Sequence, residues 1–263
     1  MNTEATRTLL FGVFVAVGRP LTASQLIRLS APLGLSATNV KSHLTRLVAD
    51  GSLQRTGPRR LAQYRPSTDK AGVVDGILAR LDAQPAERWD GRWLWLTVRL
   101  PHARGDRARL RDALWFDGFR PWGPETYLRP AWPRAWAIAS ARRHLSHRAG
   151  LCMEGRWIGR LELARVSEAY GVDALDREAS RLARDIRRRH AALTSAARAF
   201  ALRLHVGGQV ARLVAHDPRL PPEMTRGRTG LRDLRRAYRR FERAVAVKAQ
   251  AFIDASLRTG ERE

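Results

Sequence analysis

Hydrophobic residues at the start of the chain recur three or four positions apart, interrupted by residues that stop helices. Residues 7–17 follow this spacing, which predicts a helix with one buried face. A shorter helix is expected over residues 23–30. Pro32 and Gly34 then end it, because proline cannot continue a helix and glycine relaxes the turn. Two helices joined by a tight turn are therefore expected within the first part of the chain.

A further helix is predicted from Ser36 to Asp50. Ser36 stands where an N-cap belongs, since its side-chain oxygen can accept a hydrogen bond from a free amide of the first turn. Gly51 follows as a C-terminal stop. The apolar positions of this segment form one stripe at helical spacing, comprising Val40, Leu44, Leu47 and Val48.

The opposite face of this helix is polar and contains no acid before Asp50. A face that is merely solvated usually mixes glutamate with lysine. A face that enters the major groove of DNA needs hydrogen-bonding side chains and no repelled carboxylate. We therefore interpret the following residues as DNA-binding: Ser36, Thr38, Asn39, Lys41, Ser42, Thr45 and Arg46.

Residues 52–65 read as two short extended runs around Gly57 and Pro58. A basic hairpin in this position can follow phosphates or reach a minor groove, as the wing of a winged helix-turn-helix does. The alternative is an ordinary helical hairpin followed by a basic loop. The DNA-binding residues predicted in the hairpin are Arg55, Arg59, Arg60 and Arg65.

The middle of the chain is rich in tryptophan and changes its pattern. Residues 91–101 are short, almost wholly apolar and ended by proline, as in a central strand buried on both faces. Helical spacing over 107–119, an extended piece over 124–130, a short helix over 135–145 and a strand over 151–158 follow. This order predicts a small ferredoxin-like α+β domain. Its tryptophans can form a core or domain interface, or line a ligand pocket.

The last part of the chain is predicted to be helical. One helix is expected to end at Gly207 and Gly208. The final helix, over 231–257, has apolar residues close to a heptad register, so its seam can pair two subunits or fold back on its own domain. We expect an α+β protein with a winged helix-turn-helix domain at 1–68, a ferredoxin-like domain at 69–160 and a helical effector or dimerisation domain at 161–263.

Charge points to a polyanionic partner. The formal net charge is +23 with a pI near 11.7, and arginine supplies nearly all of the excess. An arginine-rich composition also arises in GC-rich genomes, but that does not explain the sign of the total. The single Cys152 excludes a disulfide framework and a cysteine-based zinc site. No apolar run has the length of a membrane span, and we expect a cytoplasmic protein.

Considered as a whole, the chain resembles the PaaX family, the transcriptional repressors of phenylacetic acid degradation. The resemblance is carried by LLFGVFVAVG and LTASQLIRLSAPLGLSATNVKSHLTRLVADGSL, then by DGRW, RARLRDALWFDGF and ETYLRP, and finally by YGVDAL, DPRLP and AYRRFERAVAVKAQAFI. It implies a repressor that binds a palindromic operator in double-stranded DNA as a homodimer. TRGRTG replaces the Trp-Pro-Gly step that family members usually show after DPRLP.

The resemblance also implies a small-molecule inducer, an acyl-CoA or aryl-CoA thioester. Arginines beside aromatic rings in the middle domain could hold its phosphates. The effector-binding residues expected on this basis are Trp95, Arg120, Trp122, Tyr127 and Arg129.

An enzyme is not expected, and no catalytic residue, metal site or cofactor is predicted. The chain has no nucleotide-binding glycine loop, nucleophile elbow or HExxH motif. His144 and His147 lie one turn apart without a nearby carboxylate, so they are interpreted as surface residues. The alternative function is a nonspecific nucleic-acid binder or nuclease. The middle domain resembles the CRISPR adaptation nuclease subunit, but Thr97, Val98 and Arg99 replace its metal-binding acid.

Overall fold

The chain forms two compact units that both combine helices with a small antiparallel sheet. The computed structural model describes residues 3–58, 62–82, 87–146, 148–159, 163–189, 195–225 and 227–258. Unit 1 comprises residues 1–82, 182–212 and 232–263, and unit 2 comprises residues 83–181 and 213–231. The predicted mixed class with a helical C-terminal part is confirmed. The three-domain division of the sequence stays a prediction, since the C-terminal segment contributes to both units.

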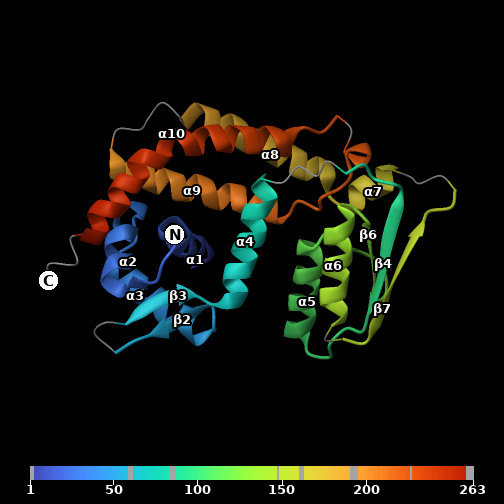
Figure 1. The fold of residues 1–263 in the computed structure, drawn as a ribbon, viewed down its shortest axis with the longest axis horizontal. Helices are drawn as coiled ribbons and strands as arrows, with labels where there is room; N and C mark the ends of the chain where they lie inside the picture. Colours follow the sequence, from blue (N-terminus) through green and yellow to red (C-terminus); the bar gives the residue numbers. More distant parts are fainter. Residues whose placement is uncertain are drawn as a thin grey trace. The chain divides into compact units, whose positions relative to one another are not determined.

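Unit 1 begins with helices that follow the predicted boundaries closely (Figure 1). Thr22 caps α2 with a capping box, in which its side chain accepts from the amide of Gln25 and its amide donates to the Gln25 side chain. Gly34 adopts φ +75° between η1 and α3, a conformation that glycine reaches without steric cost. The elements are α1 (Thr3–Val17), β1 (Leu21–Thr22), α2 (Ala23–Ser30), η1 (Ala31–Leu33), α3 (Ala37–Ala49), β2 (Leu53–Thr56), β3 (Gln63–Pro66) and α4 (Thr68–Asp82).

Three long helices contribute residues to both units: α8 (Val172–Arg189), α9 (Ala196–Ala215) and α10 (Gly230–Arg258). In unit 1, Phe200 of α9 and Ile253 of α10 are buried in one cluster with the apolar faces of α1, α2 and α3. This single core joins the N-terminal helices to the C-terminal ones. The N-terminal segment is therefore not packed as an isolated module.

Helix α9 differs from its prediction, because it continues through Gly207 and Gly208 to Ala215. The reason is packing. A Cβ at Gly208 would lie 3.1 Å from Cγ2 of Thr8 in α1, and one at Gly207 would lie 3.4 Å from the Tyr238 hydroxyl in α10. The two glycines let neighbouring side chains approach the backbone of α9, and they do not end the helix.

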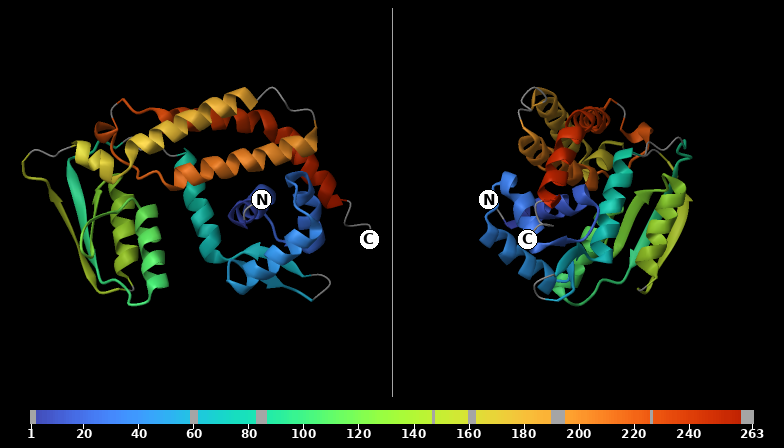
Figure 2. Two further views of the ribbon diagram at one scale, coloured as in Figure 1. Left: turned by 180° about the vertical axis from the view of Figure 1, so that it is seen from behind. Right: turned by 60° about the vertical axis from the view of Figure 1, so that its left-hand side comes forward.

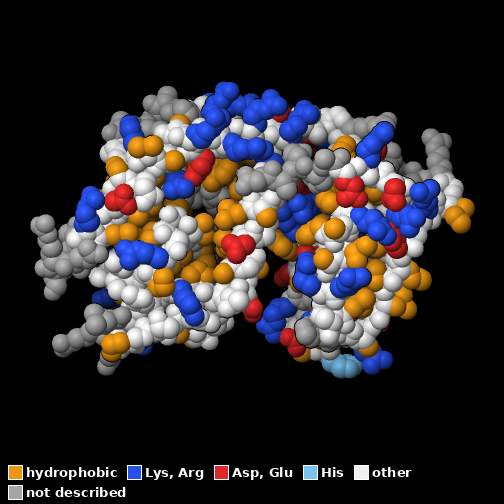
Figure 3. All heavy atoms as spheres, in the orientation of Figure 1, with side chains coloured by type: hydrophobic (Ala, Val, Ile, Leu, Met, Phe, Trp, Pro, Cys, Tyr) orange, Lys and Arg blue, Asp and Glu red, His pale blue; other side chains and the backbone are white. Residues whose placement is uncertain are grey.

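Helix α10 confirms the predicted final helix and uses its apolar seam within the chain. Leu234, Phe241 and Val245 are fully buried in the protomer, so the alternative in which the helix folds back is the one observed. Its opposite side carries exposed arginines, and Figure 3 shows Lys and Arg side chains gathered over this helix. These exposed residues are Arg232, Arg236, Arg239, Arg240 and Arg243.

Unit 2 is built on a four-stranded antiparallel sheet in the order β5-β6-β4-β7. Figures 1 and 2 show α5 and α6 on one face of this sheet, where Leu94, Leu96 and Val98 of β4 meet them. Trp93 faces the other side and packs with residues of α7. The elements are β4 (Arg92–Val98), α5 (Arg104–Phe116), β5 (Arg120–Gly123), β6 (Thr126–Pro130), α6 (Arg134–Leu145), β7 (Gly150–Arg156), α7 (Leu163–Ala169) and η2 (Pro222–Met224).

The central buried strand is confirmed as β4, which pairs with β6 on one side and β7 on the other. Strand β5 was not anticipated from the sequence. It is four residues long and contains a proline, and its pairing with β6 is shifted between Pro121 and Gly123. A short edge strand with a bulge and a proline gives little alternating pattern to detect.

Candidate nucleic-acid interface

Helix α3 is positioned by a cap at its start and a buried stripe along its length. The Ser36 side chain accepts a hydrogen bond from the Asn39 amide at 3.2 Å, as predicted for an N-cap. Val40, Leu44 and Leu47 are buried in the cluster shared with α1 and α2. Because these three anchors fix the rotation of the helix, its polar side is held outward.

All seven residues predicted on this polar side are exposed, namely Ser36, Thr38, Asn39, Lys41, Ser42, Thr45 and Arg46. The Thr45 hydroxyl donates to the Lys41 carbonyl at 3.1 Å, which leaves its oxygen free to accept. His43 lies half-buried beside this face. Burial, together with the charge of Arg46, lowers the pKa of His43 below its ordinary value, so the neutral imidazole is favoured at neutral pH. The positive charge of α3 therefore comes from Lys41 and Arg46.

The acid at the end of α3 is held by another helix. Nη1 of Arg7, in α1, lies 3.3 Å from a carboxylate oxygen of Asp50, and Nη2 donates to the Ser52 hydroxyl at 2.6 Å. Hydrogen bonding from Ser52, then the charges of Arg7 and Lys70, lower the pKa of Asp50. Sequence reasoning missed Arg7, because the contact spans 43 positions and leaves no local pattern.

The hairpin of β2 and β3 follows α3 directly. Gln54 pairs with Arg65 and Arg55 pairs with Tyr64, so the two arginines lie on opposite faces of the hairpin. Both are exposed. Arg65 donates from Nε to Oε1 of Gln54 at 3.0 Å, which orients its guanidinium. The predicted Arg59 and Arg60 lie outside the described residues.

The residues predicted for an effector are not brought together. Trp95 and Trp122 are half-buried and meet at Trp157, which stacks on Trp95 at 6.3 Å and contacts Trp122 edge-on at 5.7 Å between ring centroids. Tyr127 instead belongs to the core on the helix-covered face of the sheet. Trp157 was not proposed, since it lies outside the tryptophan-rich stretch and has no aromatic neighbour in sequence.

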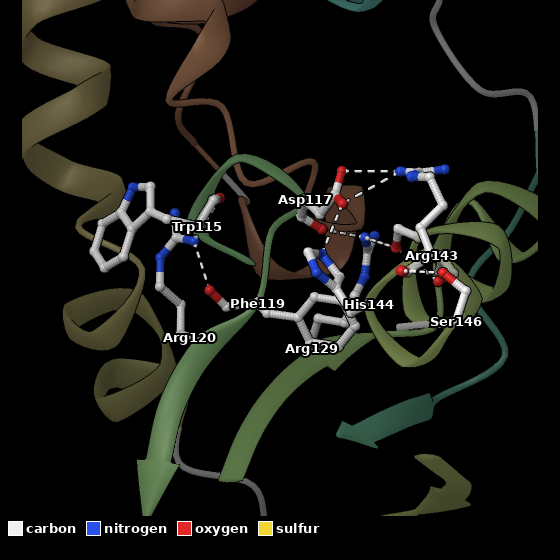
Figure 4. A network of polar contacts seen from close by, with 10 residues as sticks. Trp115, Asp117, Phe119, Arg120, Arg129, Arg143, His144 and Ser146 are labelled. Carbon is white, nitrogen blue, oxygen red and sulfur yellow. Dashed lines mark hydrogen bonds and ion pairs between the residues drawn. The ribbon is translucent and has the colours of Figure 1, made fainter. Parts of the chain in front are cut away.

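Arg120 and Arg129 are buried, with relative exposures of 1% and 0%. Arg129 donates to the carbonyl of Asp117 (Figure 4). It also donates to the carbonyls of Pro130 and Trp132, the last at 2.8 Å. Arg120 donates to the carbonyls of Trp115 and Phe119 and lies 3.6 Å from the Trp115 ring centroid. Burial lowers the pKa of Arg120 to about 10. These arginines hold the backbone of unit 2, and their placement gives no support to phosphate binding by them.

The interpretation of His144 as a surface residue near no carboxylate is wrong. His144 is buried, and its Nε2 lies 2.9 Å from a carboxylate oxygen of Asp117, while Arg143 donates to both oxygens of the same carboxylate (Figure 4). Asp117 caps the C-terminal end of α5, and His144 lies near the end of α6. Folding brings the two helix ends together, which the basic sequence around His144 does not show. His147 lies outside the described residues.

The Asp117 network predicts acid sensitivity of unit 2. Burial alone would raise the pKa of Asp117, but the His144 hydrogen bond and the charges of Arg143 and Arg129 bring it below its ordinary value of 3.8. A carboxyl with a lowered pKa in the folded state contributes stability that is complete above 3.8 and is lost at lower pH. We expect Asp117→Asn to be less stable near neutral pH and to lose less stability on acidification. Urea unfolding of both proteins between about pH 6 and pH 3 measures this. Equal losses in the two proteins would contradict it.

Comparison with known families supports a transcription regulator at the level of the family. The matching family model is that of the PaaX-like protein, and it covers residues 5–70. The family resemblance seen in the sequence is thereby confirmed over α1, α2, α3 and the β2–β3 hairpin. No curated protein matches the chain.

Among solved structures, the chain is similar to the uncharacterized protein Rv0674 from Mycobacterium tuberculosis. The TM-score is 0.55 at 23% sequence identity, and the similarity covers 97% of each chain. At this identity the likeness shows the fold alone.

Among the residues that the structure describes, no helix combines the length and the apolar composition that a membrane span requires. No group of three or more His, Cys, Asp or Glu side chains in these ranges is placed to hold a metal ion.

Proposed function

We propose that this protein is a sequence-specific DNA-binding transcription regulator that places α3 in the major groove. The observation that carries the proposal is the exposed, acid-free side of α3, fixed in orientation by its buried stripe and followed at once by an exposed basic hairpin. DNA is also the partner that the PaaX-like family implies.

The arrangement of unit 1 supports a winged helix-turn-helix. Helix α2, the turn at η1 and helix α3 precede β2 and β3, and β1 adds a third strand to the hairpin in the order β1-β3-β2. In such domains the second helix of the pair contacts base edges, while the preceding helix crosses the backbone. In this proposal Arg46 and Asn39 read bases, because arginine and asparagine make bidentate contacts to guanine and adenine.

Unit 2 supports a ferredoxin-like central domain. Its elements run strand, helix, two strands, helix, strand, and the four strands are antiparallel. This is the element order of the ferredoxin-like motif. We assign it a supporting role in the regulator, because Thr97 and Val98 occupy the end of β4, where the related nuclease subunit has its acid.

The family resemblance extends the proposal to a repressor that binds a palindromic operator as a homodimer. Two copies of α3 would then occupy successive major grooves about one helical turn apart. An acyl-CoA or aryl-CoA thioester is the effector class that the resemblance suggests. Binding of an effector would release DNA by changing the position of α3 relative to the groove.

A test begins with selection of bound duplexes from a random pool, followed by footprinting on the recovered sequence. We expect one preferred sequence with inverted symmetry and one protected region. Recovery of no preferred sequence, with protection spread evenly along the duplex, would instead indicate a nonspecific nucleic-acid binder. Titration of the selected duplex with phenylacetyl-CoA and with free CoA then tests for effector release.

The hairpin predicts the salt dependence of binding. Each phosphate contact contributes about −0.9 to the slope of log K against log salt on duplex DNA. We expect Arg55→Ala/Arg65→Ala to reduce the slope by about 1–2, and to weaken selected and unrelated duplexes alike. Since the two arginines lie on opposite faces, the single variants identify which face meets the backbone. Arg109→Ala, which removes an exposed arginine of α5, is the control. An unchanged slope in the double variant would exclude the hairpin from the interface.

A further inference from the structure

Helix α4 spans one side of unit 1 and is attached near both ends. Just before its N-terminus, the Ser67 amide donates to the Ser52 carbonyl at 3.0 Å, which fixes it beside the hairpin. Near its C-terminus, Nε of Arg235 in α10 donates to the Arg80 carbonyl at 3.2 Å, and both arginines are buried.

The inner side of α4 is an apolar stripe that faces a hollow. Its five residues fall at helical spacing, and the hollow has a volume of about 420 Å³. The opposite wall comes from α1 and α9, and Figure 3 shows hydrophobic side chains lining the hollow beside α4. Val15, Val73 and Leu78 remain 42–45% exposed at its edges. The stripe consists of Val73, Val74, Ile77, Leu78 and Leu81.

The hollow does not result from loose packing of its floor. Gly208 of α9 is so close to α1 that a Cβ there would lie 3.1 Å from Thr8. A Cβ at Gly12 of α1 would likewise lie 3.4 Å from Cδ2 of Leu204 in α9. Helices α1 and α9 are therefore in tight contact, and space remains only between this floor and α4. A volume of this size with mostly apolar walls is typical of small-molecule sites.

Charged residues stand at the end of the hollow nearest the DNA-binding surface. Arg7 and Lys70 both line it, and both act on the carboxylate of Asp50 at the end of α3. Lys70 is exposed. Glu4 also lines the hollow, and the remaining pair, Arg203 with Glu242, bonds at 2.7 Å from Nε to Oε1. Three cations and two acids line the hollow, and Asp50, which Arg7 already contacts at 3.3 Å, does not line it.

We propose that the hollow binds a small apolar molecule that carries one carboxylate. Its apolar body would lie between α4 and the floor formed by α1 and α9, and its carboxylate would be held by Arg7 and Lys70. The carboxylate would compete with Asp50 for these two cations. Because Asp50 ends α3, such competition would loosen the attachment of α3 to α1. This last step rests on the proposed DNA-binding function, whereas binding itself does not.

The test compares octanoate with octanol by calorimetric titration of the full chain without DNA. We expect octanoate to bind roughly two- to fivefold more tightly, the gain typical of a partly exposed ion pair. Lys70→Ala should remove about half of this preference in free energy, and it should leave octanol binding unchanged. Equal affinities for the two probes, with no effect of Lys70→Ala, would refute the carboxylate site.

Two variants of α4 locate the site. Leu78→Trp replaces an isobutyl group with a bulky indole ring that fills part of the hollow. Because Leu78 is already exposed, we expect this variant to fold and to bind both probes at least tenfold more weakly. Ala79→Trp adds the same ring on the outer side of α4 and should change neither affinity. Unaltered binding in Leu78→Trp would place the probe elsewhere, for example at the tryptophans of unit 2, and would overturn the proposal.

Two further outcomes are decisive. If neither probe binds, and sedimentation shows a dimer that Leu78→Trp dissociates, the hollow belongs to an interface between two copies and the proposal fails.

If octanoate binds as expected, footprints with and without it test the link to α3. If octanoate abolishes the footprint of the parent protein but not that of Leu78→Trp, the result supports competition between octanoate and Asp50. Absence of any footprint would count against the proposed function and leave the octanoate site standing.

Discussion

Replacing Arg46 by alanine is expected to weaken binding to the selected duplex by roughly 5- to 150-fold, the equivalent of one good bidentate base contact. Arg46 is exposed on the acid-free side of α3, and Leu44 and Leu47 on the buried side fix its direction. The loss should be specific. An unrelated duplex, bound through phosphates alone, should lose much less.

The measurement is an equilibrium titration of both duplexes at one salt concentration, with Arg109→Ala as the matched control. Arg109 is an exposed arginine of α5 that pairs with Asp106 on its own helix. Loss of the same size in both variants would indicate a general effect of charge. If Arg46→Ala binds the selected duplex as tightly as the parent protein, α3 does not enter the groove as proposed.

Replacing Arg129 by methionine is expected to lower the free energy of unfolding by about 3–5 kcal/mol, because each buried acceptor left without its donor costs about 1–3 kcal/mol. Methionine fills a similar volume but donates no hydrogen bond. Three backbone carbonyls and the Ser140 hydroxyl would lose their donor inside unit 2. Arg129→Lys should recover only part of the loss, because an ammonium cannot span acceptors that surround a planar guanidinium.

Urea unfolding monitored by tryptophan fluorescence measures this effect, since Trp132 and Trp136 lie beside Arg129. Arg142→Ala, which removes an exposed arginine of α6, should change stability by less than about 0.5 kcal/mol. A stable Arg129→Met protein that had lost affinity for a CoA thioester would reverse the conclusion. It would make Arg129 a ligand-binding residue, as the sequence had suggested.

The N-terminal elements could be predicted because their signals are local. Ser36 caps α3 at the expected position, and Gly51 has the positive φ that ends a helix. The apolar stripe of α3 needed only its own spacing to show which side is buried. The exposed set on α3 follows from the same spacing, so the sequence indicated both the helix and its outward face.

The features that were missed depend on residues far apart in the chain. Gly207 and Gly208 have the composition of a helix stop, but contact with Thr8 and Tyr238 explains why they lie inside α9. His144 meets a carboxylate 27 positions away. Arg120 and Arg129 have aromatic neighbours in sequence, which suggested a binding site, and only the fold shows that their donors are directed at carbonyls. Intrinsic propensity does not report such tertiary contacts.

The buried arginines also change what a nucleic acid would encounter. Arg80, Arg120, Arg129 and Arg235 are each less than 9% exposed, and the formal charge of +23 counts them in full. Counterions are displaced by cations that reach phosphates, not by cations enclosed in a protein interior. The number of ions released on binding should therefore reflect the solvent-facing cations near α3 and its hairpin. This number of released ions will be smaller than one estimated from the formal net charge of +23.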